Sequence, residues 1–298
     1  MTTATTGNLF NARSWLFAPG DSERKMQKAT ASAADIVLFD LEDAVAEEAK
    51  GTARTLIPAF LQAQPADRSR LWVRINPLQG PHALADLAAV IPGRPGGIML
   101  PKSRGRQDVE RLDHYLSALE AASNIELGST KVIALVTETA AGMFTTGDYV
   151  GAPRLVAMTW GAEDLADAVG ASENKNTDGS YGFTYELARS LCLLGAAAAE
   201  VAPVETIHGD FKDTAGLARR AQQVRRAGYR GMLAIHPAQV EVINQAFTPT
   251  AEEVAAAREI VDLFAANPGA GTIGYKGAML DRPHLARAMA LLELAKHL

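Results

Sequence analysis

Residues 36–43 read Ile-Val-Leu-Phe-Asp-Leu-Glu-Asp, a short apolar run that ends abruptly in carboxylates. Similar short runs recur along the chain, and most are followed by a stretch with helical spacing. A strand without a polar face is typical of a parallel sheet that is covered on both sides. The sequence predicts eight such strands: Ser14–Phe17, Ile36–Phe39, Leu71–Ile75, Gly97–Leu100, Val132–Val136, Leu155–Thr159, Val204–Ile207 and Met232–Ile235.

Helices are predicted between these strands. Clear examples are Ser22–Ser32, Gln107–Ala122, Tyr185–Glu200 and Thr214–Ala227, the last of which ends at Gly228. Eight strand-then-helix units, with no second run of strands, favour a closed (β/α)8 barrel of the α/β class over residues 13–249. Residues 1–12 are Thr-rich without an apolar period, and we expect a loose extension there.

The chain continues beyond the eighth strand. Thr250 and Glu253 have the spacing of a capping box at the start of a helix that extends to Ala266. A Gly-rich stretch up to Gly277 follows a helix instead of a strand, so we expect a flexible hinge and not a dinucleotide loop. Pro283 opens a last amphipathic helix. Residues 250–298 are therefore predicted to form a C-terminal helical arm.

Composition excludes several classes of protein. The 298-residue chain has a formal net charge of −5 and no basic track with interleaved aromatic residues, which argues against nucleic acid as a partner. A single cysteine, Cys192, allows no intramolecular disulfide. There is no export leader and no apolar stretch long enough to span a bilayer, so we expect a cytoplasmic protein.

Polar side chains follow the predicted strands, and in a barrel these positions converge on one rim. The rim set is Asp40, Glu42, Asp43, Arg74, Asn76, Lys102, Glu138, Glu163, Asp164, His208, Asp210 and His236. So many carboxylates would repel one another unless a hard cation neutralised them, and oxygen ligands favour Mg²⁺. Glu138 and Asp164 are the predicted metal ligands. The alternative is that each carboxylate caps the helix that follows it.

Two basic positions have competing interpretations. Arg74 ends a strand, where its planar fork could grip a substrate carboxylate or could pair with a rim carboxylate such as Glu42. Arg24 and Lys28 share a helix face four residues apart, where they could meet phosphates or could simply be solvated.

Several segments in order resemble the citrate lyase β-subunit and malyl-CoA lyase family. They are RSWLFAPG (13–20), FDLEDAV (39–45), VRINPL (73–78), LPK (100–102), TETAAG (137–142), WGAEDL (160–165) and AIHPAQV (234–240). The resemblance implies a (β/α)8 barrel that uses Mg²⁺ to cleave or form a carbon–carbon bond. The implied substrates are a 3-hydroxyacyl-CoA such as citryl-CoA or malyl-CoA on one side, and acetyl-CoA with a 2-oxo acid on the other.

The resemblance also implies roles for individual residues. Glu138 and Asp164 would hold the metal, and Arg74 would bind the oxo-acid carboxylate. Asp281, which sequence alone favours as a helix cap before Pro283, would act at the acetyl carbon from an arm that packs on a neighbouring subunit. A homo-oligomer, trimer or hexamer, is implied, and an acyl-carrier partner subunit is an option. The substrate would also touch Phe17, Arg24, Lys28, Glu42 and His236.

Residues 171–185 do not follow the citrate lyase β-subunit closely, whereas Trp160 and Glu163 resemble the malyl-CoA side of the family. The acyl-CoA is therefore left open. Three other functions also fit: a Mg²⁺-dependent acyl-CoA thioesterase, a pyruvate-type aldolase that needs no CoA, and a non-catalytic subunit that binds CoA thioesters.

Overall fold

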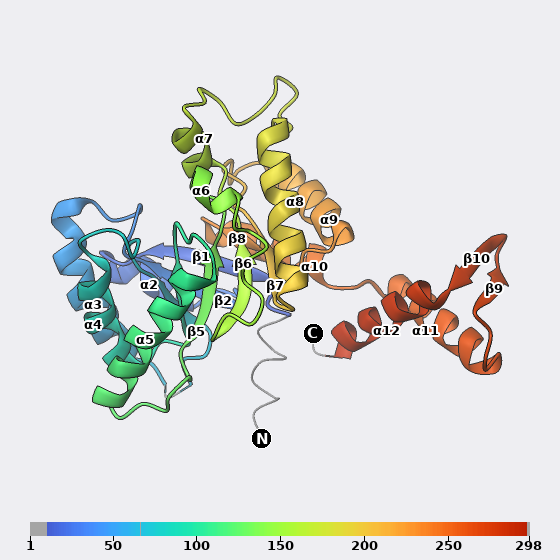
Figure 1. The fold of residues 1–298 in the computed structure, drawn as a ribbon, viewed down its shortest axis with the longest axis horizontal. Coiled ribbons are helices and arrows are strands. Elements are labelled where there is room, and N and C mark those ends of the chain that lie inside the picture. The colour runs from blue at the N-terminus through green and yellow to red at the C-terminus, as the bar shows by residue number, and fades with distance from the viewer. Residues whose placement is uncertain (1–10, 66, 297–298) are drawn as a thin grey trace. The chain divides into compact units, whose positions relative to one another are not determined.

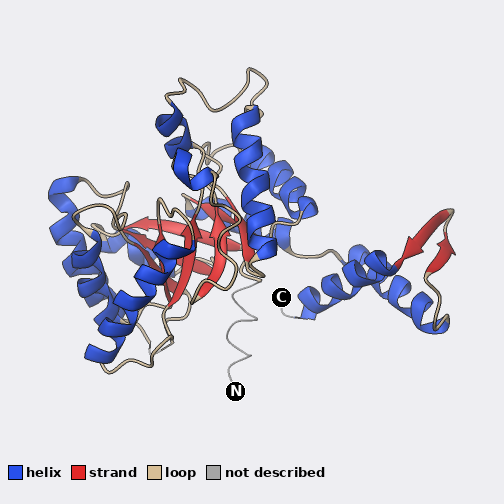
Figure 2. Cartoon of the chain, in the orientation of Figure 1, coloured by secondary structure: helices blue, strands red, loops and turns tan. Residues whose placement is uncertain are grey.

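Eight parallel strands close into a barrel in sequence order, β1 to β8, in a computed structural model that describes residues 11–65 and 67–296. The strands lie at the centre of this part of the chain and the helices lie outside them (Figures 1 and 2). The strands are β1 Ser14–Pro19, β2 Ile36–Asp40, β3 Leu71–Arg74, β4 Gly97–Leu100, β5 Lys131–Leu135, β6 Leu155–Thr159, β7 Ala202–Glu205 and β8 Gly231–Ala234.

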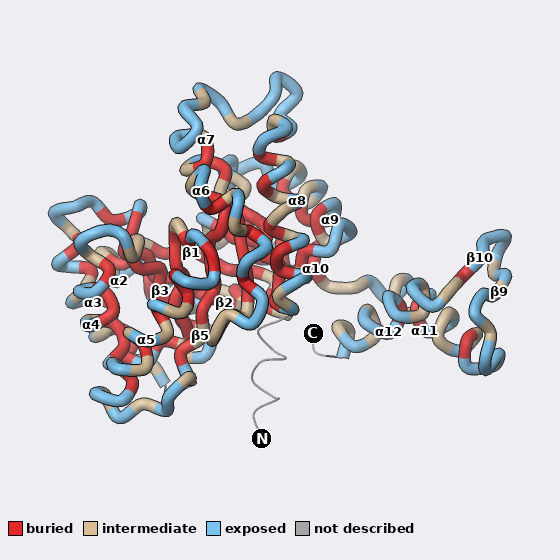
Figure 3. Tube along the Cα trace, in the orientation of Figure 1, coloured by how far each residue is buried: buried red, intermediate tan, exposed pale blue. Residues whose placement is uncertain are grey.

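The predicted barrel is confirmed. Each predicted apolar run contributes to a strand, although β7 begins two residues earlier than the predicted Val204. The strands are almost entirely buried because side chains of one face fill the barrel and those of the other pack under helices (Figure 3). The predicted extension, residues 1–12, lies outside the described residues except for Asn11 and Ala12.

Two tryptophans pack in the barrel near the amino ends of their strands, Trp15 on β1 and Trp72 on β3. Trp15 and Trp72 are fully buried and meet edge to face, with ring centroids 5.3 Å apart. Gly97 on β4 makes room for this pair, since a Cβ at that position would lie 2.4 Å from the Trp72 ring. The amino-end half of the barrel is thus filled by side chains, and functional sites in such barrels lie at the carboxyl ends of the strands.

The outer layer consists of helices that connect the strands. They are α2 Glu23–Thr30, α3 Lys50–Ala63, α4 Ala83–Val90, α5 Arg106–Ala122, α6 Ala140–Met143, α7 Glu163–Val169, α8 Phe183–Ala198, α9 Thr214–Ala227 and α10 Pro237–Phe247, with short 3₁₀ turns η1 Glu47–Ala49 and η2 Ile91–Gly93. Within the described part of the chain, no helix combines the length and the apolar character needed to cross a bilayer.

The chain divides into two compact units, the first ending at Asn244 and the second beginning at Gln245. The second unit contains α11 Ala251–Ala266 and α12 Arg282–Lys296, which pack on each other. The predicted capping box of Thr250 and Glu253 is present at the start of α11.

The prediction of a flexible hinge in the Gly-rich stretch is wrong. Residues Thr272–Tyr275 (β9) and Ala278–Asp281 (β10) form an antiparallel hairpin. Lys276 and Gly277 between them both have positive φ, the conformation that a tight two-residue hairpin turn requires. Gly274 therefore lies in a hairpin strand and Gly277 in its turn. The two strands are short and weakly apolar, so the sequence did not predict them.

Candidate functional site

A cavity of about 340 Å³ opens at the carboxyl ends of the barrel strands. Its lining gathers side chains from strands that are far apart in the sequence, as the convergence of strand ends on one rim predicts. The lining residues are Phe17, Asp40, Asp43, Ala44, Arg74, Leu135, Glu138, Trp160, Gly161, Ala162, Glu163, Asp164, Tyr181, Thr206, Ile207, Leu233 and Ile235.

Arg74 is held on one wall of this cavity by Asp40. Its Nε donates to Oδ1 of Asp40 at 2.8 Å and its Nη2 donates to Oδ2 at 2.6 Å. Burial would raise the pKa of Asp40, but the guanidinium outweighs burial and holds that pKa below its ordinary value. The Phe17 ring lies under the guanidinium at 4.8 Å. Arg74 is therefore a fixed and permanently charged group at the cavity surface.

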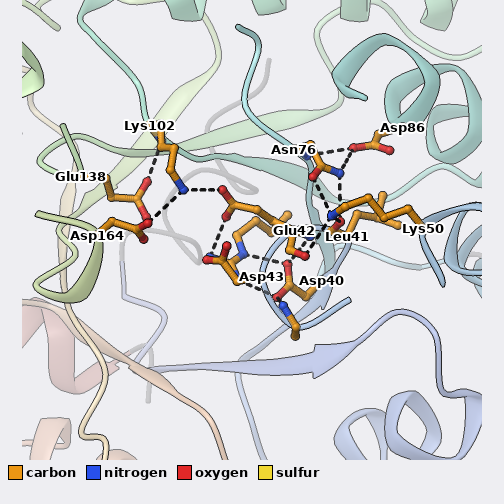
Figure 4. A network of polar contacts seen from close by, with 12 residues as sticks. Asp40, Leu41, Glu42, Asp43, Lys50, Asn76, Asp86, Lys102, Glu138 and Asp164 are labelled. Carbon is orange, nitrogen blue, oxygen red and sulfur yellow. Dashed lines mark hydrogen bonds and ion pairs between the residues drawn. The ribbon is translucent and has the colours of Figure 1, made fainter. Parts of the chain in front are cut away.

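Glu42 connects Arg74 to a second cation, Lys102. The predicted ion pair between Arg74 and Glu42 is present, with Nη1 and Oε2 2.9 Å apart. Lys102 Nζ lies 2.8 Å from the other Glu42 oxygen and 3.1 Å from Oδ1 of Asp164 (Figure 4). Burial raises the pKa of Glu42, while Arg74 and Lys102 oppose that effect. Glu42 itself lies beside the cavity and is not one of its lining residues.

Glu138 and Asp164 lie together at the ends of β5 and β6. Burial raises the pKa of Glu138 well above its ordinary value, and the charge of Glu42 and a hydrogen bond shared with Asp164 add to that effect. Burial also acts on Asp164, but the shared hydrogen bond and Lys102 bring its pKa below its ordinary value. The backbone N–H of Lys102 donates to Glu138 Oε2 at 2.6 Å.

The alternative that these two carboxylates are helix caps does not hold. The side chain that caps α6 belongs to Thr139, which accepts from the backbone N–H of Gly142. The N-cap position of α7 is Ala162, and Asp164 lies within the first turn of that helix. Both carboxylates are thus directed to the cavity instead of to a helix end.

A buried lysine fixes the loop that carries Glu42. Lys50 Nζ donates to the backbone carbonyls of Leu41 and Glu42 at 2.9 and 3.1 Å, and to the Asn76 side chain at 2.9 Å (Figure 4). The Asn76 amide in turn donates to Asp86 at 2.7 Å. Asn76, which the sequence places in the rim set, is therefore a support beneath the rim. Sequence reasoning missed Lys50 and Asp86, because each comes from a helix.

The opposite wall contains a second charged group that sequence reasoning missed. Glu205 is fully buried, 2.6 Å from Arg220 Nη2, and accepts from the Trp160 indole at 3.2 Å. Arg220 also donates to the Tyr181 hydroxyl at 3.1 Å, and its guanidinium lies 4.7 Å from the Tyr181 ring centroid. Trp160 and Tyr181 line the cavity, and the ion pair lies behind them.

Beside this cavity lies a second one of about 450 Å³. The two share Phe17 and Ile235, and the second is lined by the cations of α2, Arg24, Lys25 and Lys28. His236 borders this second cavity together with Arg24 and Lys28, and its ring stacks on Phe211 with ring centroids 4.6 Å apart.

Two predicted rim residues lie elsewhere in the barrel unit. His208 and Asp210 are not lining residues of either cavity; the His208 carbonyl accepts from Gln239, and Asp210 accepts from the backbone N–H of Lys212. Asp281 belongs to the second unit. Its carboxylate contacts the His284 ring and accepts from the His284 backbone N–H at 3.4 Å, at the start of α12.

The barrel unit also matches a known protein family in sequence. The family model of the HpcH/HpaI aldolase/citrate lyase proteins matches residues 13–237, nearly the whole barrel unit. The chain belongs to this family. A citrate lyase subunit beta-like protein from Mycobacterium tuberculosis is 36% identical over 281 residues, which cover 94% of each chain. The resemblance noted from the sequence is thereby confirmed at the level of the family.

Other family members carry different functional names. A (3S)-malyl-CoA thioesterase from Cereibacter sphaeroides is 31% identical and covers 95% of this chain and 94% of its own. A solved structure of CitE from M. tuberculosis, in complex with magnesium, acetoacetate and coenzyme A, is 33% identical. It superposes with a TM-score of 0.81 and covers 96% of this chain and 98% of its own.

Proposed function

We propose that this protein is a Mg²⁺-dependent lyase that cleaves a 3-hydroxyacyl-CoA of the malyl-CoA or citryl-CoA kind into acetyl-CoA and a 2-oxo acid, or forms it from them. One observation carries the proposal: Arg74 and the Glu138–Asp164 pair line the same cavity, and a cation-lined cavity adjoins it. An acid-binding group, an oxygen ligand pair and a phosphate-attracting helix are the parts that such a substrate requires.

The donor set fits Mg²⁺. Glu138 and Asp164 offer oxygen ligands only, and they lie close enough to share a hydrogen bond. No group of three His, Cys, Asp or Glu that could hold a metal occurs among the described residues. Two carboxylates suffice for Mg²⁺, which takes its other ligands from substrate and water. The bound ion would polarise the 2-oxo carbonyl as a Lewis acid.

Arg74 is the proposed carboxylate-binding group. A guanidinium has five N–H donors, of which Asp40 takes two and Asp43 a third. The Asp43 side chain is 57% exposed, and its 3.3 Å distance from Nη1 is the longest of the three Arg74 ion pairs. Asp43 is therefore the partner that a substrate carboxylate can displace. Asp40 and the Phe17 ring keep the guanidinium plane fixed while that exchange occurs.

The proposed reaction conserves atoms and charge. In cleavage the 3-hydroxyl group gives its proton to water and its oxygen becomes the carbonyl oxygen of the 2-oxo acid. The electron pair of the broken carbon–carbon bond passes to the acetyl-CoA enolate, which takes one proton at carbon from an acid that water then reprotonates. We assign that proton transfer to Asp281, carried by the arm of a neighbouring copy in a homo-oligomer, as the family resemblance implies. Support within this chain is that Asp281 is a part-exposed carboxylate at the start of α12.

The second cavity is the proposed place for the CoA moiety. Arg24, Lys25 and Lys28 present positive charge along one helix, and Phe17 and Ile235 connect this cavity to the first. Phosphate groups of CoA are the anions that such a surface attracts. A location in the cytoplasm, where acyl-CoA esters are available, completes the proposal.

A thioesterase is the second candidate, favoured by the relative that is named (3S)-malyl-CoA thioesterase. It would keep the metal pair and the CoA cavity but release free CoA by hydrolysis of the thioester. Arg74 would bind the substrate carboxylate in both reactions. The lyase and the thioesterase are therefore distinguished by their products.

The deciding experiment is incubation of the purified protein with Mg²⁺ and citryl-CoA, malyl-CoA, citramalyl-CoA or methylmalyl-CoA, followed by mass spectrometry. A 2-oxo acid appearing in equal amount with a shorter acyl-CoA supports the lyase. Free CoA without a 2-oxo acid supports the thioesterase. Turnover of pyruvate-type aldol substrates alone would indicate a CoA-independent aldolase, and tight CoA-ester binding without any turnover would indicate a binding subunit.

A further inference from the structure

A line of hydrogen bonds leads from the protein surface to the loop that carries Glu42. Its inner end is Lys50, which donates to the backbone carbonyls of Leu41 and Glu42. Lys50 also donates to the Asn76 side chain (Figure 4). Asp86 accepts from the backbone N–H and the side-chain amide of Asn76, at 2.8 and 2.7 Å. The orientation of Asn76 is therefore set by Asp86.

The outer part of this line consists of Arg54 and His82. Arg54 lies one turn after Lys50 on α3, and its Nε donates to Asp86 Oδ1 at 2.7 Å. Its Nη2 lies 2.8 Å from His82 Nδ1, and the other ring nitrogen, Nε2, lies 2.8 Å from the Glu47 carboxylate. The exposed fraction of the side chain falls from 24% for His82 to 21% for Arg54 and 0% for Asp86. The line thus connects solvent to the interior.

The contacts of His82 assign its tautomer. A guanidinium has donors only, so Nδ1 must accept from Arg54. The ring proton is then on Nε2, where it donates to Glu47. His82 is therefore neutral in this arrangement and bonded at both nitrogens. A second proton, on Nδ1, would remove the acceptor that Arg54 uses and would place two cations against each other.

The loop at the inner end of the line carries two of the acids that hold Arg74. Glu42 lies 2.9 Å from Arg74 Nη1, and Asp43 lies 3.3 Å from the same atom and lines the first cavity. Neither His82 nor Arg54 is among the described residues that line either cavity. Both can therefore act on the site only through the loop.

From this line of contacts we infer that His82 is a positioning residue for the loop of Glu42 and Asp43, and that it holds the loop in place only while its ring is neutral. Protonation of His82 releases Arg54, and the substrate carboxylate then binds less well at Arg74. The effect on turnover rests on the proposed function, whereas the effect on the loop does not.

The physical reason is the loss of a fixed partner at each step. When Nδ1 gains a proton, Arg54 is repelled and no longer holds Asp86 in one orientation. Asp86 then fixes Asn76 less firmly, and the bonds from Asn76 and Lys50 to the loop weaken in turn. Loss of one such hydrogen bond corresponds to about a fivefold change in an equilibrium.

Charged groups on the surrounding elements determine how His82 responds to pH. They are Glu47 on η1, Lys50 and Arg54 on α3, Asp86 on α4, and Asp108 on α5, which accepts from the Gln79 side chain of the same loop as His82. Glu47 favours the protonated ring and Arg54 opposes it. Histidine ordinarily changes its charge between pH 5 and 8, so the loop should be held at pH 8 and loosened at pH 6.

Two variants imitate the two states of the ring. His82→Gln has one acceptor and one donor group at every pH, so it can keep both Arg54 and Glu47 as partners. His82→Lys has no acceptor and carries a positive charge. The first variant should hold the loop at pH 6 as well as at pH 8, and the second should hold it at neither.

Hydrogen exchange of the ligand-free protein, followed by mass spectrometry, reports on the loop directly. The backbone N–H groups of Glu42 and Ala44 donate to Asp40, and that of Val45 donates to the Glu42 carbonyl. After correction for intrinsic exchange rates, wild-type protection of these amides should fall by about fivefold from pH 8 to pH 6. An equal fall in His82→Gln, no fall in wild type, or full protection in His82→Lys overturns the inference.

The matched control is His114→Gln, the same change at an exposed histidine on α5. It should keep the wild-type response of the loop to pH. Loss of that response in His114→Gln would show that His82 is not its source.

Turnover of the acyl-CoA esters separates this inference from the proposed function. The ratio of kcat/KM in wild type to that in His82→Gln should fall by about fivefold from pH 8 to pH 6, mainly through KM, because Arg74 is the proposed carboxylate-binding group. A loop response without turnover of any ester leaves the inference standing and overturns the lyase. Turnover with the same pH profile in both proteins overturns the inference and leaves the lyase standing.

Discussion

Asp40 and Arg74 are direct register partners at the carboxyl ends of β2 and β3, and their side chains form a two-point ion pair. Side chains that point into a barrel alternate along each strand, so register decides which inward residues meet. Here it sets an acid beside a base on adjacent strands. Arg74 is fixed by the fold itself and not only by the ligand that it is proposed to bind.

Asp40→Asn should destabilise the protein by about 3 kcal/mol at pH 7, because it breaks a buried ion pair and leaves Arg74 undercompensated. Since Arg74 holds the Asp40 pKa below its ordinary value, the stabilisation is present above about pH 4 and is lost as pH falls through the lowered pKa. Urea unfolding of both proteins at pH 7 and in acid measures the difference.

The matched control for this variant is Asp35→Asn. Asp35 also pairs with an arginine, Arg13 at 2.9 Å, but both side chains are more than 20% exposed. We expect a loss of about 1 kcal/mol or less. If the difference between wild type and Asp40→Asn were the same at every pH, the ion pair would not be its cause.

Glu138→Gln and Asp164→Asn should each lower Mg²⁺-dependent turnover by about a hundredfold or more. Each removes one carboxylate from a two-carboxylate site, so the rise in Tm on adding Mg²⁺ should also disappear. The control is Glu163→Gln, which changes a neighbouring lining carboxylate that is not a proposed ligand. Near-normal turnover, with an unchanged Mg²⁺ effect on Tm, would refute the ligand assignment.

The barrel could be predicted because its strands are buried on both faces and therefore appear in the sequence as uninterrupted apolar runs, such as Ile36–Phe39. The rim residues could be predicted as the polar side chains that directly follow those runs. The hairpin of β9 and β10 could not be predicted in this way, since its burial alternates weakly and glycine interrupts it at Gly274.

The partners of the rim residues were the part that sequence could not supply. Glu205 and Arg220 lie 15 positions apart on a strand and a helix, and their contact depends on how α9 packs. Lys50 reaches the loop of Glu42 from α3 in the same way. Such contacts follow from tertiary packing and have no local signature.

Lys50→Met should lower both stability and activity. It leaves the carbonyls of Leu41 and Glu42 and the Asn76 side chain without a donor in a buried setting, at a cost of about 2–3 kcal/mol. Because the freed loop carries Glu42 and Asp43, kcat/KM should fall by about tenfold or more even at temperatures where the variant is folded.

Lys131→Met is the comparison for that experiment. Lys131 donates to a single carbonyl, that of Gly128, at 2.8 Å, and it lies at the start of β5, away from the rim. A stability loss of about 1 kcal/mol with full activity is expected. Lys50→Met with normal kcat/KM would show that the loop does not depend on Lys50 for its position.

Arg24→Ala combined with Lys28→Ala should raise KM for a CoA thioester by about tenfold and leave the binding of the free 2-oxo acid unchanged, because both side chains line only the second cavity. The effect should shrink as salt screens the phosphates, which separates charge attraction from loss of packing. Steady-state kinetics in low and high salt, with calorimetry for the 2-oxo acid, measure both quantities.

Arg111→Ala, which changes an exposed arginine on α5, controls for net charge. An unchanged KM would place the CoA moiety elsewhere, whereas weaker binding of the free 2-oxo acid would mean that the two cavities are not independent.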